Sequence, residues 1–415
     1  MTGISFSAIA AVVVVGVAVA IGLLVGAGDD SDGGSPFGGG AAELDTAWTV
    51  SSYDLSDHGA FDRADGTVPG AILSTSHGWV SMVEPATLEA VLVSVDPDSG
   101  EVQWSTPVPE GRCTSTTPDS ILCLTRDGGS QFQLLTVAAE TGDPVGDPVP
   151  TDLTHVPVFV VPMGTDGLVT LSITAELAGL DLQGSTLWTE QIDLGDYEAE
   201  WLDVDTAAYA SSVILHLGAY VGTVQASAEG AAVHDCQGVA ATPEAWMCQG
   251  EDEAVGRAPD GTELWREDWQ DYYLVDQYQQ IAPVMIVDNW DGTVSAVNPV
   301  TGEHAAPVDL STGRSFNFLG DAEHPFVLTE DSINLLDAGL TTVLWSSPIR
   351  DEYLNIAGGG VIDEVLVVDG ESSWGFDLAT GDELWRRDFL PYDVMVVDDA
   401  LAGLRITELV RYALP

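Results

Sequence analysis

VLVSVDPDSGEVQW, at Val91–Trp104, and WGFDLATGDELW, at Trp374–Trp385, follow one pattern. An apolar strand leads to an acidic residue, a turn that contains glycine, and a second strand that ends in tryptophan. Six looser versions lie between them, and the eight turns fall at positions 100, 142, 184, 230, 261, 302, 341 and 381. A period of about 40 residues predicts a repeat protein, in which each unit is stabilised by packing against its neighbours.

The turns and the runs between them predict an all-β unit. The apolar runs are short and either alternate or are wholly apolar, which is typical of β-strands, and the body has no amphipathic helical stretch of useful length. Six glycines stand where a tight hairpin needs a positive φ angle. They are Gly100, Gly142, Gly184, Gly261, Gly302 and Gly381.

Five tryptophans follow the turn positions by four residues. They are Trp104, Trp188, Trp265, Trp345 and Trp385. At that place in an outer strand an indole can lie between neighbouring sheets, and its burial would contribute about 2–3 kcal/mol. We therefore predict that these side chains pack between repeats, with ligand binding as the alternative.

The two ends of the body are complementary. Asp45–Ser52 resembles an outer strand without partners, and the chain ends in strands that lack an outer partner. Closure of a ring by the first strand would remove the exposed sheet edges. We predict that Leu44–Pro415 is an all-β, eight-bladed β-propeller of four-stranded antiparallel blades, with seven or nine blades as alternatives.

The four cysteines form two close pairs, Cys113 with Cys123 and Cys236 with Cys248. Neither pair has the C-x-x-C spacing of zinc or thioredoxin-like sites. Each pair falls on two successive predicted strands, which brings such residues within disulfide range. We predict two structural disulfides, and hence an oxidising compartment, with buried free thiols as the alternative.

The N-terminus predicts a membrane anchor. Ile4–Val25 is an uncharged apolar run long enough to span a bilayer as a helix. It lacks the basic n-region of a signal peptide, so we favour an uncleaved signal anchor over a cleaved signal. Met1–Gly3 would then be a short cytoplasmic tail, Gly26–Glu43 a flexible Gly/Ser/Asp-rich linker, and the body would lie on the extracytoplasmic side.

The charge is strongly one-sided. The chain has 66 Asp and Glu residues against 11 basic residues, for a net charge of −55, and every basic residue is arginine. Such a chain repels phosphate backbones, which excludes nucleic acid as a partner. The carboxylates keep an outer surface soluble or, alternatively, recruit cations or a basic partner.

The phrase x-D-x-x-T-G-x-x-x-W resembles the tryptophan-docking repeat of quinoprotein-like (PQQ-type) propellers. Phe376–Trp385 matches it fully, and Val95–Trp104 matches with Ser99 in place of threonine. The resemblance covers essentially all of Leu44–Pro415 and implies the propeller fold. It does not imply one function, since the fold carries unrelated activities.

Within this family the chain is most similar to the non-catalytic, membrane-anchored branch, which includes propellers similar to BamB. That resemblance implies a binding or scaffold module with no cofactor, whose partner is a protein or cell-envelope component. One alternative is a quinoprotein-like oxidoreductase that uses PQQ and calcium in the central channel. This chain lacks the adjacent cysteines and the calcium motif of those enzymes. Another alternative is a sensor ectodomain that works with a separate membrane kinase.

The candidate contact surface is the aromatic and acidic segment WREDWQDYYLVDQY. Its aromatic members are Trp269, Tyr272, Tyr273 and Tyr278, set among Glu267, Asp268, Asp271 and Asp276. Aromatic rings mixed with carboxylates can form a contact surface for a protein or a sugar. The alternative is an outer strand and the loop to the next blade. The sequence contains no metal-ligand spacing of histidines and no nucleophile motif, so we predict no catalytic or metal-binding residues.

Overall fold

The computed structural model describes residues 45–413 except for short internal stretches. Those stretches are 56–58, 62–71, 86–89, 127–128, 130, 165–166, 196–203, 219–220, 270–271, 276–283, 290, 311–314, 322, 330, 350–357, 363, 370–371, 389–392, 399 and 405–407. All of the described residues belong to one compact unit, Ala41–Pro415. Met1–Gly3, Ile4–Val25 and Gly26–Glu43, for which the sequence predicts a tail, an anchor and a linker, lie outside the described residues. Within the described part, no helix is long and apolar enough to cross a membrane.

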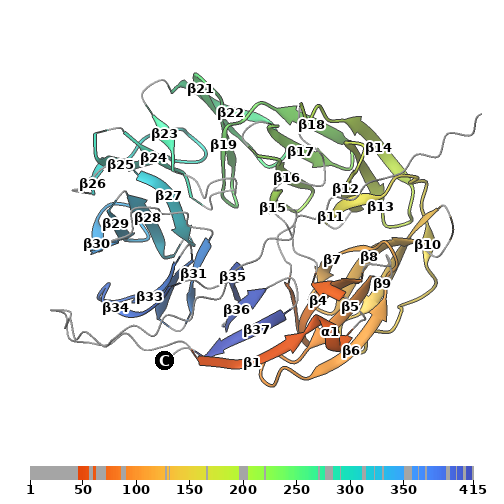
Figure 1. Cartoon of the computed structure of the whole chain (residues 1–415). Helices are drawn as coiled ribbons and strands as arrows, with labels where there is room; N and C mark the ends of the chain where they lie inside the picture. The colour runs from red at the N-terminus through yellow and green to blue at the C-terminus, as the bar shows by residue number, and fades with distance from the viewer. Residues whose placement is uncertain are drawn as a thin grey trace, which may run out of the picture. The chain divides into compact units, whose positions relative to one another are not determined.

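The described residues form nine antiparallel sheets that follow one another around a ring (Figure 1). Blades 1–3 comprise β2 (Gly59–Phe61), β3 (Ile72–Thr75), β4 (Gly78–Pro85), β5 (Val91–Val95) and β6 (Val102–Pro107); β7 (Arg112–Thr117), β8 (Ser120–Arg126), β9 (Phe132–Ala138) and β10 (Val149–Pro150); and β11 (Pro157–Met163), β12 (Gly167–Ser172), β13 (Glu176–Asp181) and β14 (Thr186–Gln191).

Blades 4–6 continue the same order, from the inner strand to the outer strand. They comprise β15 (Asp205–Ala208), β16 (Ser212–His216), β17 (Thr223–Ser227) and β18 (Gly230–His234); β19 (Gly238–Ala241), β20 (Trp246–Gln249), β21 (Glu253–Arg257) and β22 (Glu263–Asp268); and β23 (Tyr273–Leu274), β24 (Ile286–Asp288), β25 (Thr293–Ala296) and β26 (Val308–Asp309).

Blades 7–9 complete the ring. They comprise β27 (Ser315–Gly320), β28 (Pro325–Thr329), β29 (Ser332–Leu336) and β30 (Val343–Pro348); β31 (Gly358–Ile362), β32 (Val365–Asp369), β33 (Ser372–Asp377) and β34 (Glu383–Asp388); and β35 (Asp393–Val397), β36 (Ala400–Leu404) and β37 (Glu408–Ala413), joined by β1 (Asp45–Ser51). The four-residue helix α1 (Ser52–Leu55) follows β1.

The structure has nine blades over the residues that it describes, so the favoured count of eight is wrong and the alternative of nine is confirmed. Each of the eight repeated phrases spans the turn between the third and fourth strands of one blade. The ninth blade takes its fourth strand from the other end of the chain, so no such turn exists there to be counted. The phrase around Gly230 is irregular in sequence, yet it lies in a complete four-stranded blade, β15–β18.

Strand β1 closes the ring as the complementary ends of the chain predict. It pairs with β37 in antiparallel register from Asp45↔Ala413 to Ser51↔Glu408, and Figure 1 shows β1 and β37 side by side there. β1 is the outer strand of blade 9, so it pairs the edge of β37 that the chain would otherwise leave exposed.

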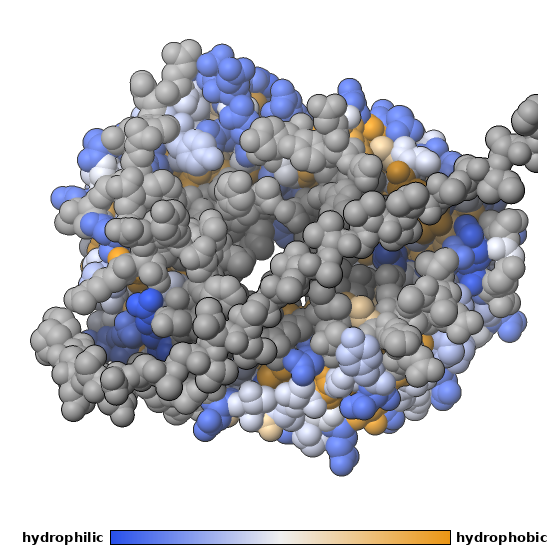
Figure 2. All heavy atoms as spheres, viewed as in Figure 1, coloured by the Kyte–Doolittle hydropathy of each residue, from blue (hydrophilic) through white to orange (hydrophobic). Residues whose placement is uncertain are grey.

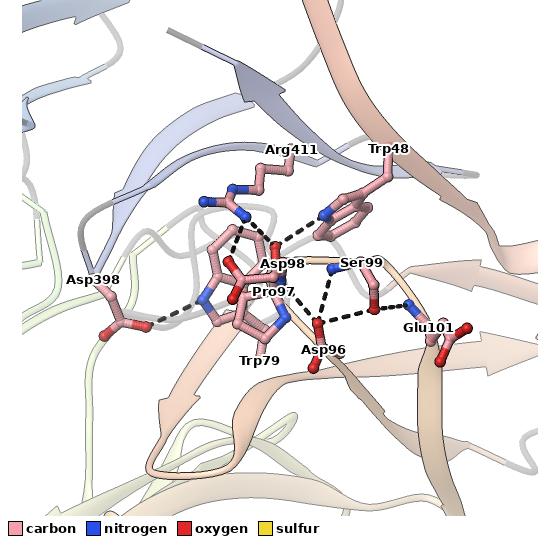
Figure 3. A network of polar contacts seen from close by, with 9 residues as sticks. All are labelled: Trp48, Trp79, Asp96, Pro97, Asp98, Ser99, Glu101, Asp398 and Arg411. Carbon is pink, nitrogen blue, oxygen red and sulfur yellow. Dashed lines mark hydrogen bonds and ion pairs between the residues drawn. The ribbon is translucent and has the colours of Figure 1, made fainter.

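Two sets of polar contacts join blade 9 to blade 1 (Figure 3). On the outer side, Trp48 Nε1 and an Arg411 guanidinium nitrogen both donate to the carbonyl oxygen of Pro97, at 2.9 and 2.7 Å. Arg411 also pairs with Asp98 at 2.9 Å. In the second set, the carboxylate of Asp398 accepts from Ser74 and from Trp79 Nε1.

The Trp48 contact is one instance of a repeated joint. In five places the indole nitrogen of an outer strand donates to the carbonyl oxygen three residues before the turn glycine of the next blade, at 2.7–2.9 Å. The pairs are Trp48–Pro97, Trp104–Ala139, Trp188–Ser227, Trp265–Pro299 and Trp345–Leu378. Each indole therefore links two blades, because its ring belongs to one and its hydrogen-bond acceptor to the next.

The glycines at these turns permit the indole to approach closely. Gly302 and Gly381 have φ angles of +75° and +74°. A Cβ atom at either position would lie 2.7 Å from the ring of Trp265 or 2.5 Å from the ring of Trp345. All six of the glycines identified in the sequence have positive φ. Gly184 contacts the backbone of the preceding blade, and Gly261 contacts a glutamine side chain.

Blade 4 has no tryptophan in its outer strand, and a glutamine makes its joint instead. Gln225 lies in the third strand, and its Nε2 donates to the Pro259 carbonyl oxygen at 2.8 Å. Ser212 donates to the same oxygen at 2.7 Å. The side chain of Gln225 packs under Gly261, where other joints place an indole. The irregular phrase around Gly230 thus keeps the interblade hydrogen bond with a different donor.

Trp385 has a different environment from the other four predicted tryptophans. It lies in β34 of blade 8, whose neighbour, blade 9, has no turn between its third and fourth strands. Its ring is fully buried against Leu401, Val410 and Tyr412 of that blade. Trp385 therefore also packs between blades, but through apolar contact.

The two predicted disulfides are present, Cys113–Cys123 and Cys236–Cys248. Cys113 and Cys123 are directly paired residues on β7 and β8 of blade 2. Cys236 comes just before β19, and Cys248 lies in β20 of blade 5. Each bond therefore links the first and second strands of a blade, or the residue leading into the first, over a separation of 10 or 12 residues.

Replacing the indole of one joint tests how much these contacts stabilise the ring. We expect Trp345→Ala to lower the free energy of unfolding by about 3 kcal/mol, because it leaves a cavity between blades 7 and 8. Trp345→Phe should cost about 1–3 kcal/mol, since it keeps a ring but leaves the Leu378 carbonyl oxygen without its donor. Denaturant unfolding of the body, residues 44–415, measures both. The matched control is Leu344→Ala, at a neighbouring side chain that is 59% exposed, with an expected change within about 0.5 kcal/mol.

Candidate interaction surface

The aromatic segment after β22 is divided between the core and the surface. Trp269 is only 2% exposed and belongs to the apolar core between blades 5 and 6, with Met247 and Leu274. Tyr272 is partly buried, and Tyr273, at the start of β23, is 40% exposed. Tyr278, Asp271 and Asp276 lie outside the described residues. The predicted contact surface therefore contains one buried anchor, Trp269, and two tyrosines that reach solvent.

Four side chains of this segment and of the next blade come together around one carboxylate. His304 Nε2 lies 3.2 Å from Glu267 Oε2, and Trp269 Nε1 donates to the same oxygen at 3.5 Å. The rings of Tyr272 and His304 have centroids 4.7 Å apart, and the Trp269 ring meets both edge-on, with centroids 6.0 and 6.1 Å away. We call Glu267, Trp269, Tyr272 and His304 the blade 5–6 cluster.

The blade 5–6 cluster follows from the geometry of the joint. Trp265 docks on the turn that contains Gly302, so residues two positions further along each strand also meet. Those residues are Glu267 and His304. In the sequence, His304 lies far from Glu267 and has no metal-ligand spacing to another histidine. Its partner could have been found by aligning each tryptophan with the turn glycine of the following repeat.

The described arginine side chains are all engaged within the fold. Arg112 and Arg257 donate to backbone carbonyl oxygens, Arg126 pairs with Glu110, and Arg266 pairs with Glu253 and Glu263. Three guanidinium groups also lie over rings, at 4.4, 5.9 and 5.6 Å from the centroids: Arg126 over Phe132, Arg257 over Trp246 and Arg386 over Trp374. With Arg411 at the ring closure, these six residues are tied to internal partners.

Several described carboxylates are strongly exposed, including some that have a partner. The side chains of Asp98 and Asp119, for example, are 89% and 78% exposed. In the view of Figure 2, the described residues at the periphery are mostly hydrophilic, with hydrophobic residues visible between them. Because the described arginines are engaged by partners of the chain itself and the chain carries a net charge of −55, the ring has a strongly negative potential.

The aspartates at several turns accept hydrogen bonds from backbone N–H groups, so their carboxylates stabilise the turns. Asp96 Oδ1 accepts from the backbone N–H groups of Asp98 and Ser99, at 3.0 and 2.8 Å. These hydrogen bonds, led by the one from Ser99, lower the pKa of Asp96 below its usual value. The same contacts recur at Asp377 and Asp337, where hydrogen bonds from Thr341 and Thr342 overcome desolvation and lower the pKa of Asp337 to about 2.

Within the described residues, no group of three or more His, Cys, Asp or Glu side chains is placed to hold a metal ion. The most deeply buried described histidine is His216, 1% exposed, in the second strand of blade 4. Its Nδ1 lies 2.9 Å from Thr223 Oγ1, and burial lowers the pKa of His216 to about 4. It is therefore a neutral core residue at physiological pH.

Comparison with known proteins adds a fold likeness and no function. No family model matches the chain, and no curated protein matches it. BamB from Moraxella catarrhalis has 13% identity and a TM-score of 0.47, over 90% of this chain and 98% of that one. The C-terminal WD40 domain of Sif2 has 8% identity and a TM-score of 0.49, over 91% of this chain and 100% of that one. These likenesses are too distant to carry an argument about what this chain binds.

Burial of His216 predicts a pH-dependent stability. Above about pH 6.5 the residue is neutral in both states and contributes no slope. As the pH falls from 6.5 toward 4, the unfolded chain takes up a proton that the folded ring does not, so stability decreases by an amount on the order of 3 kcal/mol. We expect His216→Gln to remove this part of the slope. Unfolding of both proteins at pH 7 and pH 4.5 measures it, and equal slopes would contradict the assignment.

Proposed function

We propose that this protein is an extracytoplasmic, membrane-tethered β-propeller that acts as a non-catalytic binding or scaffold module for a basic protein or another basic component of the cell envelope. One observation carries the proposal: the described arginines are all engaged by partners of the chain itself, which leaves a closed ring with a large excess of carboxylates. A ring closed through β1 holds its surface in fixed positions, so a partner need not order it on binding.

The tether in this proposal rests on the sequence. Ile4–Val25 would anchor the chain in the cytoplasmic membrane, and Gly26–Glu43 would let the ring stand off the bilayer. The two disulfides support an oxidising location outside the cytoplasm. The acidic ring would be repelled by anionic lipids, which favours a partner above the membrane surface over the membrane itself.

Basic-partner binding is tested with the body, residues 44–415, and synthetic peptides. We expect saturable binding of a lysine- and arginine-rich peptide and none of an acidic peptide of equal length. Affinity should fall steeply as ionic strength rises from about 0.01 M to about 1 M, because the Debye length shortens from about 30 Å to about 3 Å. A calcium-dependent thermal shift on addition of PQQ, with no peptide binding, would favour the quinoprotein alternative.

Membrane tethering is tested with the full chain. We expect it to sediment with membranes, to resist extraction by high salt and to be released by detergent, because an apolar helix is held by the bilayer core and not by charge. A variant that lacks residues 1–43 should remain in the soluble fraction. Protease added outside intact cells should digest the ring. Recovery of the full chain as a soluble protein of the cytoplasm would contradict the proposal.

A further inference from the structure

We propose that the blade 5–6 cluster binds a single lysine or arginine side chain of the basic partner, with Glu267 as the charge acceptor and Tyr272 as the aromatic contact. This inference rests on the proposed function and assigns the place on the ring where that function is concentrated.

The first argument is the geometry of the carboxylate. Both described contacts of Glu267, from His304 and from Trp269, are made to Oε2. They fix the orientation of the group and leave Oε1 for a donor from outside. The Glu267 side chain is 40% exposed and that of His304 is 19% exposed, so the fixed carboxylate can be reached from solvent.

The second argument is the aromatic environment. The Tyr272 ring packs on the imidazole of His304, which contacts Glu267. The buried Trp269 ring meets both of these rings edge-on. A cation beside an aromatic ring gains about 0.5–2 kcal/mol, and arginine does so most often. The Glu267 carboxylate can therefore pair with the charged group of one basic side chain while the partly exposed Tyr272 ring contacts the rest of that side chain.

The third argument is that the nearest arginine in the strand is already engaged. Arg266 precedes Glu267 in β22, but its guanidinium pairs with Glu253 and Glu263 in the same blade. Among the described residues, the contacts of Glu267 come from an imidazole and an indole and not from a guanidinium. A cation from a partner would thus meet a carboxylate that no described arginine has neutralised.

The chain contains a matched position without the cluster. Glu190 lies two residues after Trp188 in β14, as Glu267 lies two residues after Trp265 in β22, and both pair with the same place in the third strand, at Leu177 and Ala254. Two positions after the turn residue of the next blade stands Ala232 at the joint of Trp188, where His304 stands at the joint of Trp265. Glu190 carries the same charge on an equivalent strand, so it separates the local site from the general negative potential.

The experiment measures calorimetric binding of an arginine-containing basic peptide to the full chain in detergent and to its Glu267→Gln and Glu190→Gln variants. We expect Glu267→Gln to weaken binding about tenfold, because it removes a charge-assisted hydrogen bond. Glu190→Gln should weaken it less than about twofold, since a distant exposed charge contributes only a screened interaction. Replacing the arginine of the peptide with citrulline should abolish the difference between the two variants.

A second pair of variants tests the aromatic contact and guards against misfolding. Tyr272→Phe should keep most of the affinity, and Tyr272→Leu should lose several-fold, because leucine has no ring face for the cation. Thermal unfolding of each variant shows whether the ring is intact. Equal affinities for Glu267→Gln and Glu190→Gln would overturn the inference and leave the proposed function standing. A wild-type chain that binds no basic peptide would overturn the proposed function itself.

Discussion

A hydrogen bond from an indole to the turn of the next blade is the interaction on which the ring depends. Strands within a blade are joined by backbone hydrogen bonds, whereas the contacts between neighbouring blades depend mainly on side chains. An indole supplies a large apolar face and one donor at a fixed position. It therefore fixes how far apart the two blades lie and how the next blade is shifted relative to the first. Blade 4 has no tryptophan in its outer strand, and Gln225 donates to the Pro259 carbonyl oxygen instead. The outer strands of blades 2 and 6, Val149–Pro150 and Val308–Asp309, also contain no tryptophan. Among the described residues, the indole hydrogen bond therefore joins five of the nine pairs of neighbouring blades.

The closing joint uses the same indole hydrogen bond, but it also requires strands from the two ends of the body to pair. Trp48 lies only 49 positions before Pro97, but its strand, β1, becomes part of blade 9 by pairing with β37 from the other end of the chain. Arg411 contacts the same Pro97 carbonyl oxygen across 314 positions, and Asp398 adds a second set of contacts. Closing a loop of this length carries an entropic cost, which these contacts offset in part.

The fold could be predicted from the sequence to the level of the repeat, and the number of blades could not. The strand, turn and tryptophan pattern has a local cause in each unit, and the strand Asp45–Ser51 could be assigned to the closing blade from its lack of partners. The count failed because the marker used for it, the turn between third and fourth strands, does not occur in a blade assembled from both ends of the chain. The cysteine pairs were predictable because paired positions on adjacent strands depend only on local register.

Only part of the candidate site could be predicted from the sequence. Trp269, Tyr272 and Glu267 stand close together in one segment, but burial separates Trp269 from the surface residues around it. His304 lies 37 positions beyond Glu267, and its role depends on the docking of one repeat on the next. That relation can be obtained from the period, once the tryptophan of one repeat is aligned with the turn glycine of the following one.

The chemistry of the joints also explains how an acidic ring can bind through charge without losing its fold. Five joints use a neutral indole and a sixth uses a neutral amide, and salt does not screen such hydrogen bonds as it screens exposed charges. The excess carboxylates face outward, where they repel one another but contribute little to the contacts between blades. Ionic strength therefore acts on encounters with a charged partner far more than on the joints. Under the proposed function, recognition would be tuned by salt and by single carboxylates such as Glu267 while the ring that presents them stays intact.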